Sequence, residues 1–183
     1  MIHLLSDVQT DKVGEGTNVW QYAIILKGAT IGKNCNINCH TFIENDVALG
    51  DNVTVKSGVY LWDGITVKDN VFIGPNVTFT NDKRPRSKKY PDSFQKTIIN
   101  ENASIGAGAI ILGGIEIGAN AMIAAGSLVT KNVPEKALVK GSPAIVSAWL
   151  NDDGTKMEYK NGFFEDNKGN KWQLLNNELI LKL

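Results

Sequence analysis

Long apolar runs and an excess of charge of either sign are absent from this chain. Its 183 residues carry 19 basic and 19 acidic side chains, so no net field attracts DNA, RNA or an anionic membrane. No apolar run approaches the roughly 18 residues of a membrane-spanning helix. The first residues, 1–12, are too polar for a signal peptide. We therefore expect a cytoplasmic protein in which any anion is bound by local groups.

Cysteine and histidine are also scarce, with two of each. Cys35 and Cys39 stand four residues apart, and no further Cys or nearby His pair completes a metal-binding set. We expect Cys35 to be a small buried residue and the protein to bind no metal.

A six-residue repeat runs through most of the chain. Apolar residues recur at every sixth position from Val13 to Phe79, and a second series runs from Ile99 to Val129. A period of six fits neither a helix nor an isolated strand, so each hexad must be a short strand followed by a corner. Three corners close a triangle, and triangles stack about 4.8 Å apart. The sequence therefore predicts a triangular prism, residues 1–134, with every sixth side chain inside.

The residues between these apolar positions fit such corners. Small or apolar residues usually stand four positions after each member of the series, where the tight inner corner falls. Gly, Asn or Asp usually stands three positions after it, and these residues tolerate positive φ. Tyr22 and His40 depart from this rule, and each needs a functional reason or an ordinary surface explanation.

The repeat fails at residues 80–98, which are polar, basic and contain two prolines. We expect this segment to be an extruded loop, because long irregular loops in compact domains are usually functional or disordered.

The C-terminal part of the chain leaves the repeat. Residues 135–150 are expected to form a linker and, at 144–150, a short amphipathic helix that caps the open end of the prism. Residues 151–183 contain short β segments between turns and predict a small β-hairpin tail, docked on the prism or a neighbouring subunit. The side chains expected to dock are Phe163, Phe164, Trp172 and Leu174.

Units such as Ile31-Gly32, Leu49-Gly50 and Ile105-Gly106 resemble those of the hexapeptide-repeat acyltransferases, over about residues 13–147. The resemblance implies left-handed coiling, which is the exception to the usual right-handed crossover. It also implies acetyl-CoA as co-substrate and a homotrimer with active sites between neighbouring prisms. Flat prism faces with Trp20, Tyr22 and Trp62 exposed are compatible with a trimer.

The resemblance is most specific around the loop. Segment 74–87, with Asn81-Asp82 followed by Pro85-Arg86, looks like bacterial enzymes that N-acetylate 3-amino sugars on a nucleoside diphosphate. Segments 19–26, 42–47 and 60–67 reinforce it. Together they are most similar to transferases for dTDP-3-amino-3,6-dideoxyhexoses, rather than to the uronic-acid enzymes. This implies a role in bacterial surface-glycan biosynthesis, such as lipopolysaccharide O-antigen or S-layer glycan.

Amine attack on a thioester needs a neutral amine, a route for its proton and stabilisation of the oxyanion. Asn81 cannot be a base, but its amide oxygen could accept a hydrogen bond from the sugar amine and aim the lone pair. The alternative is a turn-forming Asn. His40 is the candidate general base, because histidine titrates near neutrality. It could equally be a surface residue, with the leaving CoA thiolate taking the proton.

Counting back by 18 from Asn81 gives Asp63 and then Asn45, which should form one outward row. Asp63 would then border the loop and could hold a sugar hydroxyl or take a proton, or be a solvated corner residue. Trp62 and Glu44 fall in the adjacent row. An exposed Trp62 suggests stacking on a sugar or base, whereas Glu44 is a candidate sugar ligand or an ordinary surface acid.

The loop also carries candidate ligands for the nucleotide. Arg forks suit a pyrophosphate, and Arg86 is preferred among the loop cations because the resemblance includes its Pro-Arg pair. Asp82 is assigned to substrate binding with the Asn-Asp pair. For CoA, the resemblance implies a groove along coils of small residues, where a pantetheine arm could reach backbone amides. Tight corners need small residues too. The groove candidates are Gly106, Ala107, Gly108, Ala124, Ala125 and Gly126.

Other functions on such a scaffold are alternatives to this one. A γ-type carbonic anhydrase needs three His on zinc per site, and only His40 lies within the repeat. An acyltransferase for serine, a hydroxyl, a 4-amino sugar or a UDP-amino sugar stays open, as does a non-enzymatic β-helix that only binds partners. The configuration of the sugar at C4 and the length of the acyl chain are also left open.

Overall fold

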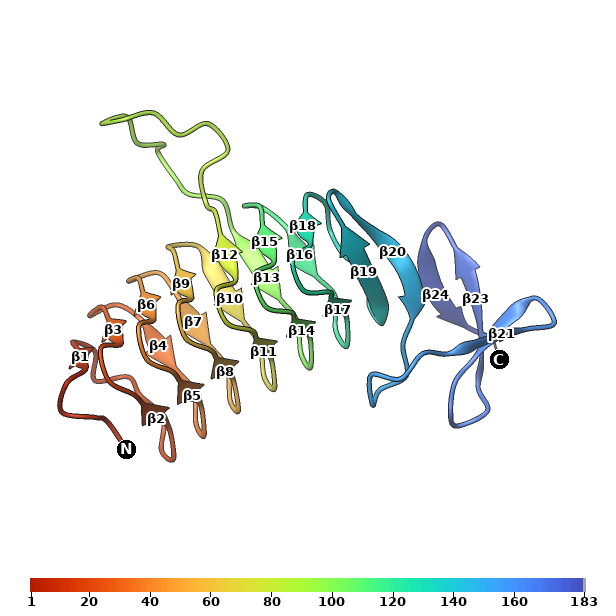
Figure 1. The fold of residues 1–183 in the computed structure, drawn as a ribbon, viewed down its shortest axis with the longest axis horizontal. Helices are drawn as coiled ribbons and strands as arrows, with labels where there is room; N and C mark the ends of the chain where they lie inside the picture. Colours follow the sequence, from red (N-terminus) through yellow and green to blue (C-terminus); the bar gives the residue numbers. More distant parts are fainter. Residues whose placement is uncertain (183) are drawn as a thin grey trace.

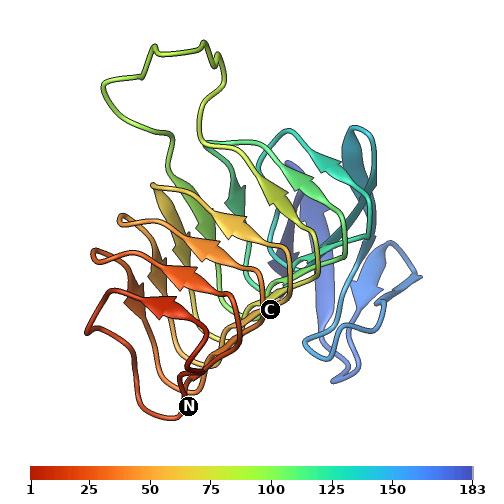
Figure 2. The same ribbon diagram turned by 60° about the vertical axis from the view of Figure 1, so that its left-hand side comes forward.

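The structure, a computed structural model, describes residues 1–182 and builds them from short β-strands. Within that range there is no helix, and so none with the length and hydropathy of a membrane span. Three sheets form the faces of a triangular prism, seen from the side in Figure 1 and closer to end-on in Figure 2. The predicted left-handed parallel β-helix is confirmed.

Successive strands along the chain visit the three faces in turn. The seven-stranded sheet contains β1 (Asp7–Val8), β3 (Ile24–Ile25), β6 (Phe42–Ile43), β9 (Tyr60–Leu61), β12 (Thr78–Phe79), β15 (Ile110–Ile111) and β18 (Leu128–Val129). The five-stranded sheet contains β4 (Thr30–Ile31), β7 (Ala48–Leu49), β10 (Ile65–Val67), β13 (Thr97–Ile99) and β16 (Glu116–Ile117). The eight-stranded sheet contains β2 (Asn18–Val19), β5 (Asn36–Ile37), β8 (Thr54–Val55), β11 (Phe72–Ile73), β14 (Ser104–Ile105), β17 (Met122–Ile123), β19 (Ala137–Gly141) and β20 (Ala144–Trp149).

The register between coils follows the sequence period. Ile25 pairs with Ile43, and Ile43 pairs with Leu61, so each strand is hydrogen-bonded to the strand one coil later. These every-sixth side chains are fully buried, and Cys35 is buried at an inner corner as expected. Parallel stacking therefore lines the prism with aliphatic side chains and leaves alternate residues of each strand outside.

Two of the three prism edges carry the candidate site residues. The corners leading from the eight-stranded to the seven-stranded sheet, such as 38–41, 106–109 and 124–127, form the small-residue edge. The corners leading from the seven-stranded to the five-stranded sheet, such as 44–47 and 62–64, form the loop edge. Residues 80–96 leave the prism at the loop edge as an extruded loop, which stands clear of the coils in Figure 1.

The prediction of a helix at 144–150 is wrong. This segment is β20, which pairs antiparallel with β19 and covers its free edge. Gly141, at φ 103°, lies at the turn that reverses the chain between the two strands. The unpaired edge of β19 offers hydrogen-bond partners that a helix would leave unused, and β-branched residues such as Ile145 and Val146 suit a strand. The end of the prism is thus covered by a strand rather than by a helix.

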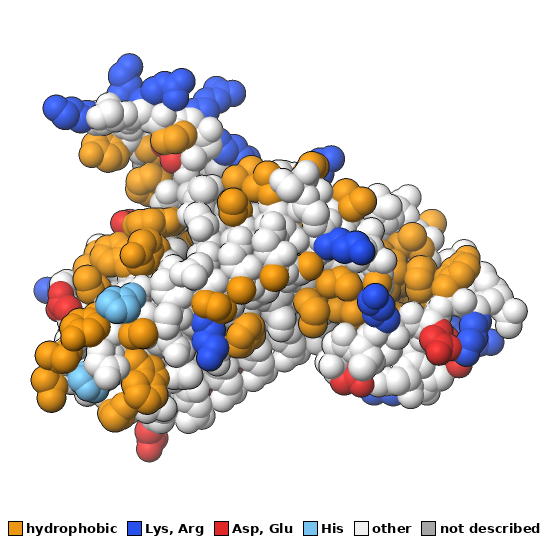
Figure 3. All heavy atoms as spheres, viewed as in Figure 1, with side chains coloured by type: hydrophobic (Ala, Val, Ile, Leu, Met, Phe, Trp, Pro, Cys, Tyr) orange, Lys and Arg blue, Asp and Glu red, His pale blue; other side chains and the backbone are white. Residues whose placement is uncertain are grey.

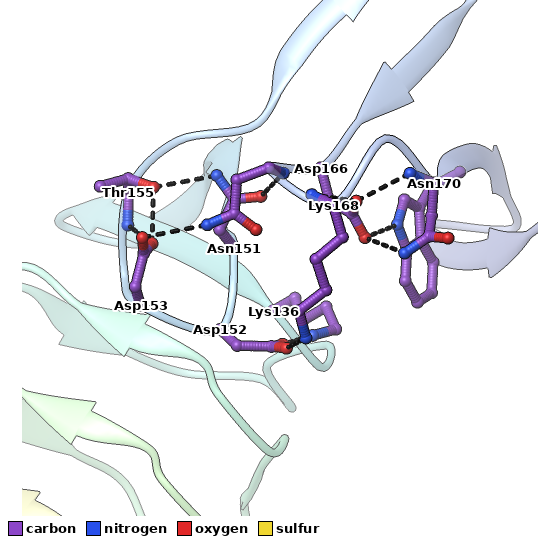
Figure 4. Close-up of polar contacts among 10 residues, drawn as sticks. Lys136, Asn151, Asp152, Asp153, Thr155, Asp166, Lys168 and Asn170 are labelled. Carbon is purple, nitrogen blue, oxygen red and sulfur yellow. Dashed lines mark hydrogen bonds and ion pairs between the residues drawn. The ribbon is translucent and has the colours of Figure 1, made fainter.

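Residues beyond the prism form a four-stranded antiparallel sheet: β21 (Glu158–Lys160), β22 (Phe163–Glu165), β23 (Lys171–Leu175) and β24 (Glu178–Leu181). Phe164 and Trp172 pack against the hydrophobic core, whereas Leu174 stays 43% exposed. The buried Lys136 pairs with Asp152 beside this sheet, and its Nζ also lies 5.6 Å from the Trp172 ring centroid. Figure 4 shows the polar network that joins the tail to the last coil.

Candidate active site

Three successive coils place Glu44, Asp63 and Asn81 at the loop edge. Each lies just after a strand of the seven-stranded sheet: β6, β9 and β12 respectively. Hydrogen bonds connect neighbouring members of this group. The predicted row holds for Asp63 and Asn81, which are 18 residues apart and directly bonded, whereas Glu44 comes from the adjacent row. Whether these residues act on a substrate stays a prediction.

Asp63 is the centre of this group. Its backbone N–H donates to Glu44 Oε2 at 2.7 Å, and its Oδ1 accepts from the backbone N–H of Asp46 at 2.7 Å. Its carbonyl oxygen accepts from Asn81 Nδ2 at 3.2 Å. One carboxylate oxygen of Asp63 is thus committed to the stacking of coils, which leaves Oδ2 for any contact with a substrate.

The half-buried Asn81 amide is oriented by its partner. A carbonyl oxygen only accepts hydrogen bonds, so the NH₂ group of Asn81 must face Asp63. No donor within residues 1–182 is hydrogen-bonded to Asn81 Oδ1, which is therefore available as an acceptor. An acceptor at this place is the chemistry expected for binding an amine N–H.

Asp82 and the start of the loop line a small hollow beside Asn81. Its volume is about 220 Å³, and Lys83, Arg84 and Gln95 contribute to it. Asp82 Oδ1 accepts from the backbone N–H of Arg84 at 2.8 Å, which fixes the turn. Asp82 and Asn81 thus line the same hollow.

Arg86 lies outside this hollow. Its Nη1 donates to the carbonyl oxygen of Pro85 at 2.8 Å, and the side chain is exposed. Figure 3 shows the Lys and Arg side chains gathered on the far part of the loop, away from the prism. Arg86 is thus an exposed residue of the extruded loop and does not line the hollow beside Asn81.

Two residues that the sequence analysis missed fix the base of the loop. The backbone N–H of Gln95 donates to the carbonyl oxygen of Asn81 at 3.1 Å and so closes the loop. A Cβ at the buried Gly113 would lie 2.9 Å from the carbonyl oxygen of Thr80 and 3.1 Å from Asn81 Cα. Only glycine allows this approach without a shift of backbone, and the Gly113-Gly114 pair was the signal that could have found it.

Trp62 is half-buried rather than freely exposed. Its Nε1 donates to the carbonyl oxygen of Phe79 at 2.9 Å, at the strand that leads into the loop. Its ring lies 5.8 Å from Phe42 and 5.9 Å from Tyr60, centroid to centroid. The expected role in stacking on a sugar or base stays a prediction, while the observed contacts brace the start of the loop.

His40 lies on the small-residue edge, not on the loop edge. It adopts φ 58°, and Tyr22 at the equivalent corner adopts φ 60°, so both take the left-handed conformation usual for Gly or Asn there. Their rings stack with centroids 5.2 Å apart. His40 and Asn81 follow strands of different faces, so one chain does not bring the two catalytic candidates together.

The candidate CoA residues occupy two consecutive corners of the same small-residue edge. Gly108 and Gly126 have positive φ, and a Cβ on either would meet no atom within 4 Å, so space is open outside these corners. A Cβ at Gly106 would lie 2.5 Å from Ala125 N, so the stacking of coils alone requires glycine there. Ala107 and Ala125 are exposed, and their small side chains leave the backbone accessible.

Comparisons with known proteins agree with this architecture. The chain matches the family model described as bacterial transferase hexapeptide (six repeats) over residues 46–81 and 96–131. It also matches the hexapeptide repeat of succinyl-transferase over residues 28–62.

Two curated relatives are enzymes that transfer acetyl groups. The dTDP-3-amino-3,6-dideoxy-α-D-galactopyranose 3-N-acetyltransferase of Aneurinibacillus thermoaerophilus is 51% identical over 158 residues, 86% of this chain and 82% of the relative. The galactoside O-acetyltransferase of Lactococcus lactis is 41% identical over 87 residues, 45% of this chain and 42% of the relative.

Solved structures share the fold. A Bacillus cereus protein assigned to the acetyltransferases superposes with a TM-score of 0.58 at 28% identity, over 76% of this chain and 80% of that chain. A variant of perosamine N-acetyltransferase from Caulobacter crescentus, solved with CoA and GDP-perosamine, superposes with a TM-score of 0.50 at 22% identity, over 80% of this chain and 55% of that chain.

Proposed function

This chain belongs to the bacterial hexapeptide-repeat transferases, and from that premise we propose that it transfers an acetyl group from acetyl-CoA to a dTDP-linked 3-amino-3,6-dideoxyhexose. The acceptor is the 3-amino group. The observation that carries the proposal is the 51% identity, over most of both chains, to an enzyme named for that reaction on the galacto-configured sugar. The proposed co-substrates imply a cytoplasmic enzyme of surface-glycan biosynthesis.

The reaction needs few protein groups. The neutral amine attacks the thioester carbonyl carbon, the C–S bond breaks, and the amine proton leaves with the CoA thiolate or through a base. In our proposal Asn81 Oδ1 accepts a hydrogen bond from the amine and aims its lone pair at the thioester. His40 can take part only as a base from a second subunit, because its own Asn81 lies on another edge.

We further propose a homotrimer with active sites between prisms. The loop-edge candidates and the CoA candidates lie on different edges of one chain, so a complete site needs the loop edge of one subunit beside the small-residue edge of the next. The seven-stranded face between these edges exposes apolar side chains such as Tyr60, at 49%, and Ile110, at 40%. Burial of such a face is what an obligate interface requires.

The loop supplies the remaining proposed contacts. Arg86 is assigned to the pyrophosphate, which its guanidinium fork fits, and Asp82 to the substrate beside Asn81. Trp62 and Asp63 Oδ2 are the candidate contacts at the loop edge. For acetyl-CoA we propose the small-residue edge around Ala107 and Ala125.

A thiol-release assay tests the proposal. Acetyl-CoA is supplied with dTDP-linked 3-amino and 4-amino deoxysugars, their UDP-linked counterparts, and a galactoside whose acceptor is a hydroxyl. Release with a dTDP-3-amino sugar supports the proposed reaction, and comparison of the galacto and gluco sugars identifies the C4 configuration. Release only with another acceptor, or no release from folded trimer, would overturn it.

A further inference from the structure

The contact between Glu44 and Asp63 joins the loop edge to the amide of Asn81. We propose that Glu44 is a positioning residue: its carboxylate holds the Asp63 turn, and the Asp63 carbonyl in turn orients the Asn81 amide toward the acceptor amine. This inference rests on the proposed function for its effect on turnover, but the orientation itself is a property of the chain. It differs from the role first expected of Glu44, which was direct contact with the sugar.

The corners of the loop edge follow a pattern that Asn81 breaks. At the two preceding coils a side-chain oxygen accepts a backbone N–H of the coil before it: Asn45 Oδ1 from Gly28 at 3.0 Å, and Asp63 Oδ1 from Asp46 at 2.7 Å. At Asn81 the side chain instead donates its NH₂ to the Asp63 carbonyl. The side-chain oxygen that accepts an N–H of the preceding coil at positions 45 and 63 does not do so at position 81, where the loop begins.

Asp63 can orient Asn81 because Asp63 is itself held on two other sides. Glu44 Oε2 accepts its backbone N–H, and its carboxylate holds the N–H of Asp46. Glu44 is only half-exposed, and its contact to the Asp63 N–H is short, at 2.7 Å, as charge-assisted hydrogen bonds are. Loss of the Glu44 carboxylate would leave that N–H without its acceptor and free the turn to rotate.

Two substitutions at Glu44 separate positioning from sugar binding. Glu44→Gln keeps one oxygen that can accept the Asp63 N–H, whereas Glu44→Ala keeps none. We expect Glu44→Ala to lower kcat by roughly tenfold or more, with the KM of both substrates little changed, and Glu44→Gln to restore most of the rate. Lys27→Ala, exposed on the same edge three coils earlier than Asn81, serves as the control.

A double-mutant cycle with Asn81→Ala then tests whether Glu44 acts through Asn81. If it does, Glu44→Ala causes little further loss once the Asn81 amide is gone. Additive losses, or a Gln variant as impaired as Ala with a raised KM for the nucleotide sugar, would show that Glu44 contacts substrate directly and would overturn the proposal.

A readout without turnover keeps this proposal separate from the proposed function. The side-chain NH₂ resonance of Asn81 is assigned in a ¹⁵N spectrum by its loss in Asn81→Ala. We expect Glu44→Ala to shift this resonance and Glu44→Gln to leave it near its original position. An unshifted resonance in Glu44→Ala overturns the positioning role, whatever acceptor the enzyme uses, while a shift supports it even where the thiol-release panel fails.

Discussion

Gly113 lies directly against Asn81 at the base of the loop. A Cβ at position 113 would stand 3.1 Å from Asn81 Cα and 2.9 Å from the carbonyl oxygen of Thr80. Both contacts are with backbone, which cannot yield as the end of a flexible side chain can. The coil that follows the loop therefore controls where the proposed acceptor-binding amide lies.

Gly113→Ala should disturb the reaction more than the fold. We expect a loss of about 1–3 kcal/mol in the free energy of unfolding from overpacking, and a fall in kcat because Asn81 is displaced. Thermal unfolding and steady-state kinetics measure the two effects. A lowered Tm with unaltered kcat would confine Gly113 to a role in stability.

Asn81→Ala should keep the fold and the oligomer but reduce kcat by roughly a hundredfold. The side chain is half-buried and, among residues 1–182, its one hydrogen bond is to Asp63, so little packing is lost. Asn45→Ala is the matched control, because Asn45 occupies the equivalent corner two coils earlier. A rate in Asn81→Ala equal to that of the control would remove Asn81 from the mechanism.

Arg86→Ala should raise the KM for the nucleotide sugar and leave the KM for acetyl-CoA unchanged. The reason is loss of a guanidinium fork for the pyrophosphate. Lys89→Ala removes an exposed positive charge from the same loop and serves as the control. If both variants raised the KM for the nucleotide sugar equally, and both increases disappeared at high salt, only the summed charge of the loop would matter. An effect confined to acetyl-CoA would reassign Arg86 to that substrate.

Ala125→Tyr should raise the KM for acetyl-CoA by an order of magnitude or more, because a large side chain would fill the proposed groove. Ala125 is exposed, so the substitution costs the core nothing. Glu101→Tyr, an exposed corner of a different edge, is the control for added bulk. Kinetics with each substrate varied in turn measure the effect, and an unchanged KM for acetyl-CoA places its arm elsewhere.

The prism could be predicted because its period is a local property of the chain. Every sixth residue takes the inward-facing position on one face of the prism, so its burial follows from spacing alone. The prediction of a helix at 144–150 was wrong because the choice of element there is not a local property of the chain. Its apolar pattern suits either element, and the choice was made by the free edge of β19, a partner that local sequence does not reveal.

In the candidate site, too, sequence spacing predicted which residues lie together but not which of their atoms are hydrogen-bonded. Counting in eighteens correctly grouped Asp63 with Asn81, but which oxygen of Asp63 is already used depends on hydrogen-bond geometry. Trp62 was expected to be exposed, yet its N–H is committed to Phe79 because the strand before the loop passes within reach. The separation of His40 from Asn81 was available from the sequence, since counting by hexads assigns them to different corners.

The tail should loosen in acid before the prism does. Burial raises the pKa of the Asp166 carboxyl, but hydrogen bonds from Asn170, Trp172 and the Lys168 backbone outweigh it and lower the pKa from 3.8 to about 2. Because the folded pKa lies below the unfolded one, the carboxylate stabilises the tail fully above about pH 4, and this stabilisation is lost as the pH falls through about 2. The Trp172 Nε1–H, which donates to Asp166 Oδ2 at 2.9 Å, reports the change as an indole resonance. We expect the chemical shift of that resonance to titrate near pH 2 and to lose this titration in Asp166→Asn. A midpoint near pH 3.8 would mean that these hydrogen bonds to the Asp166 carboxylate do not form when the protein is in solution.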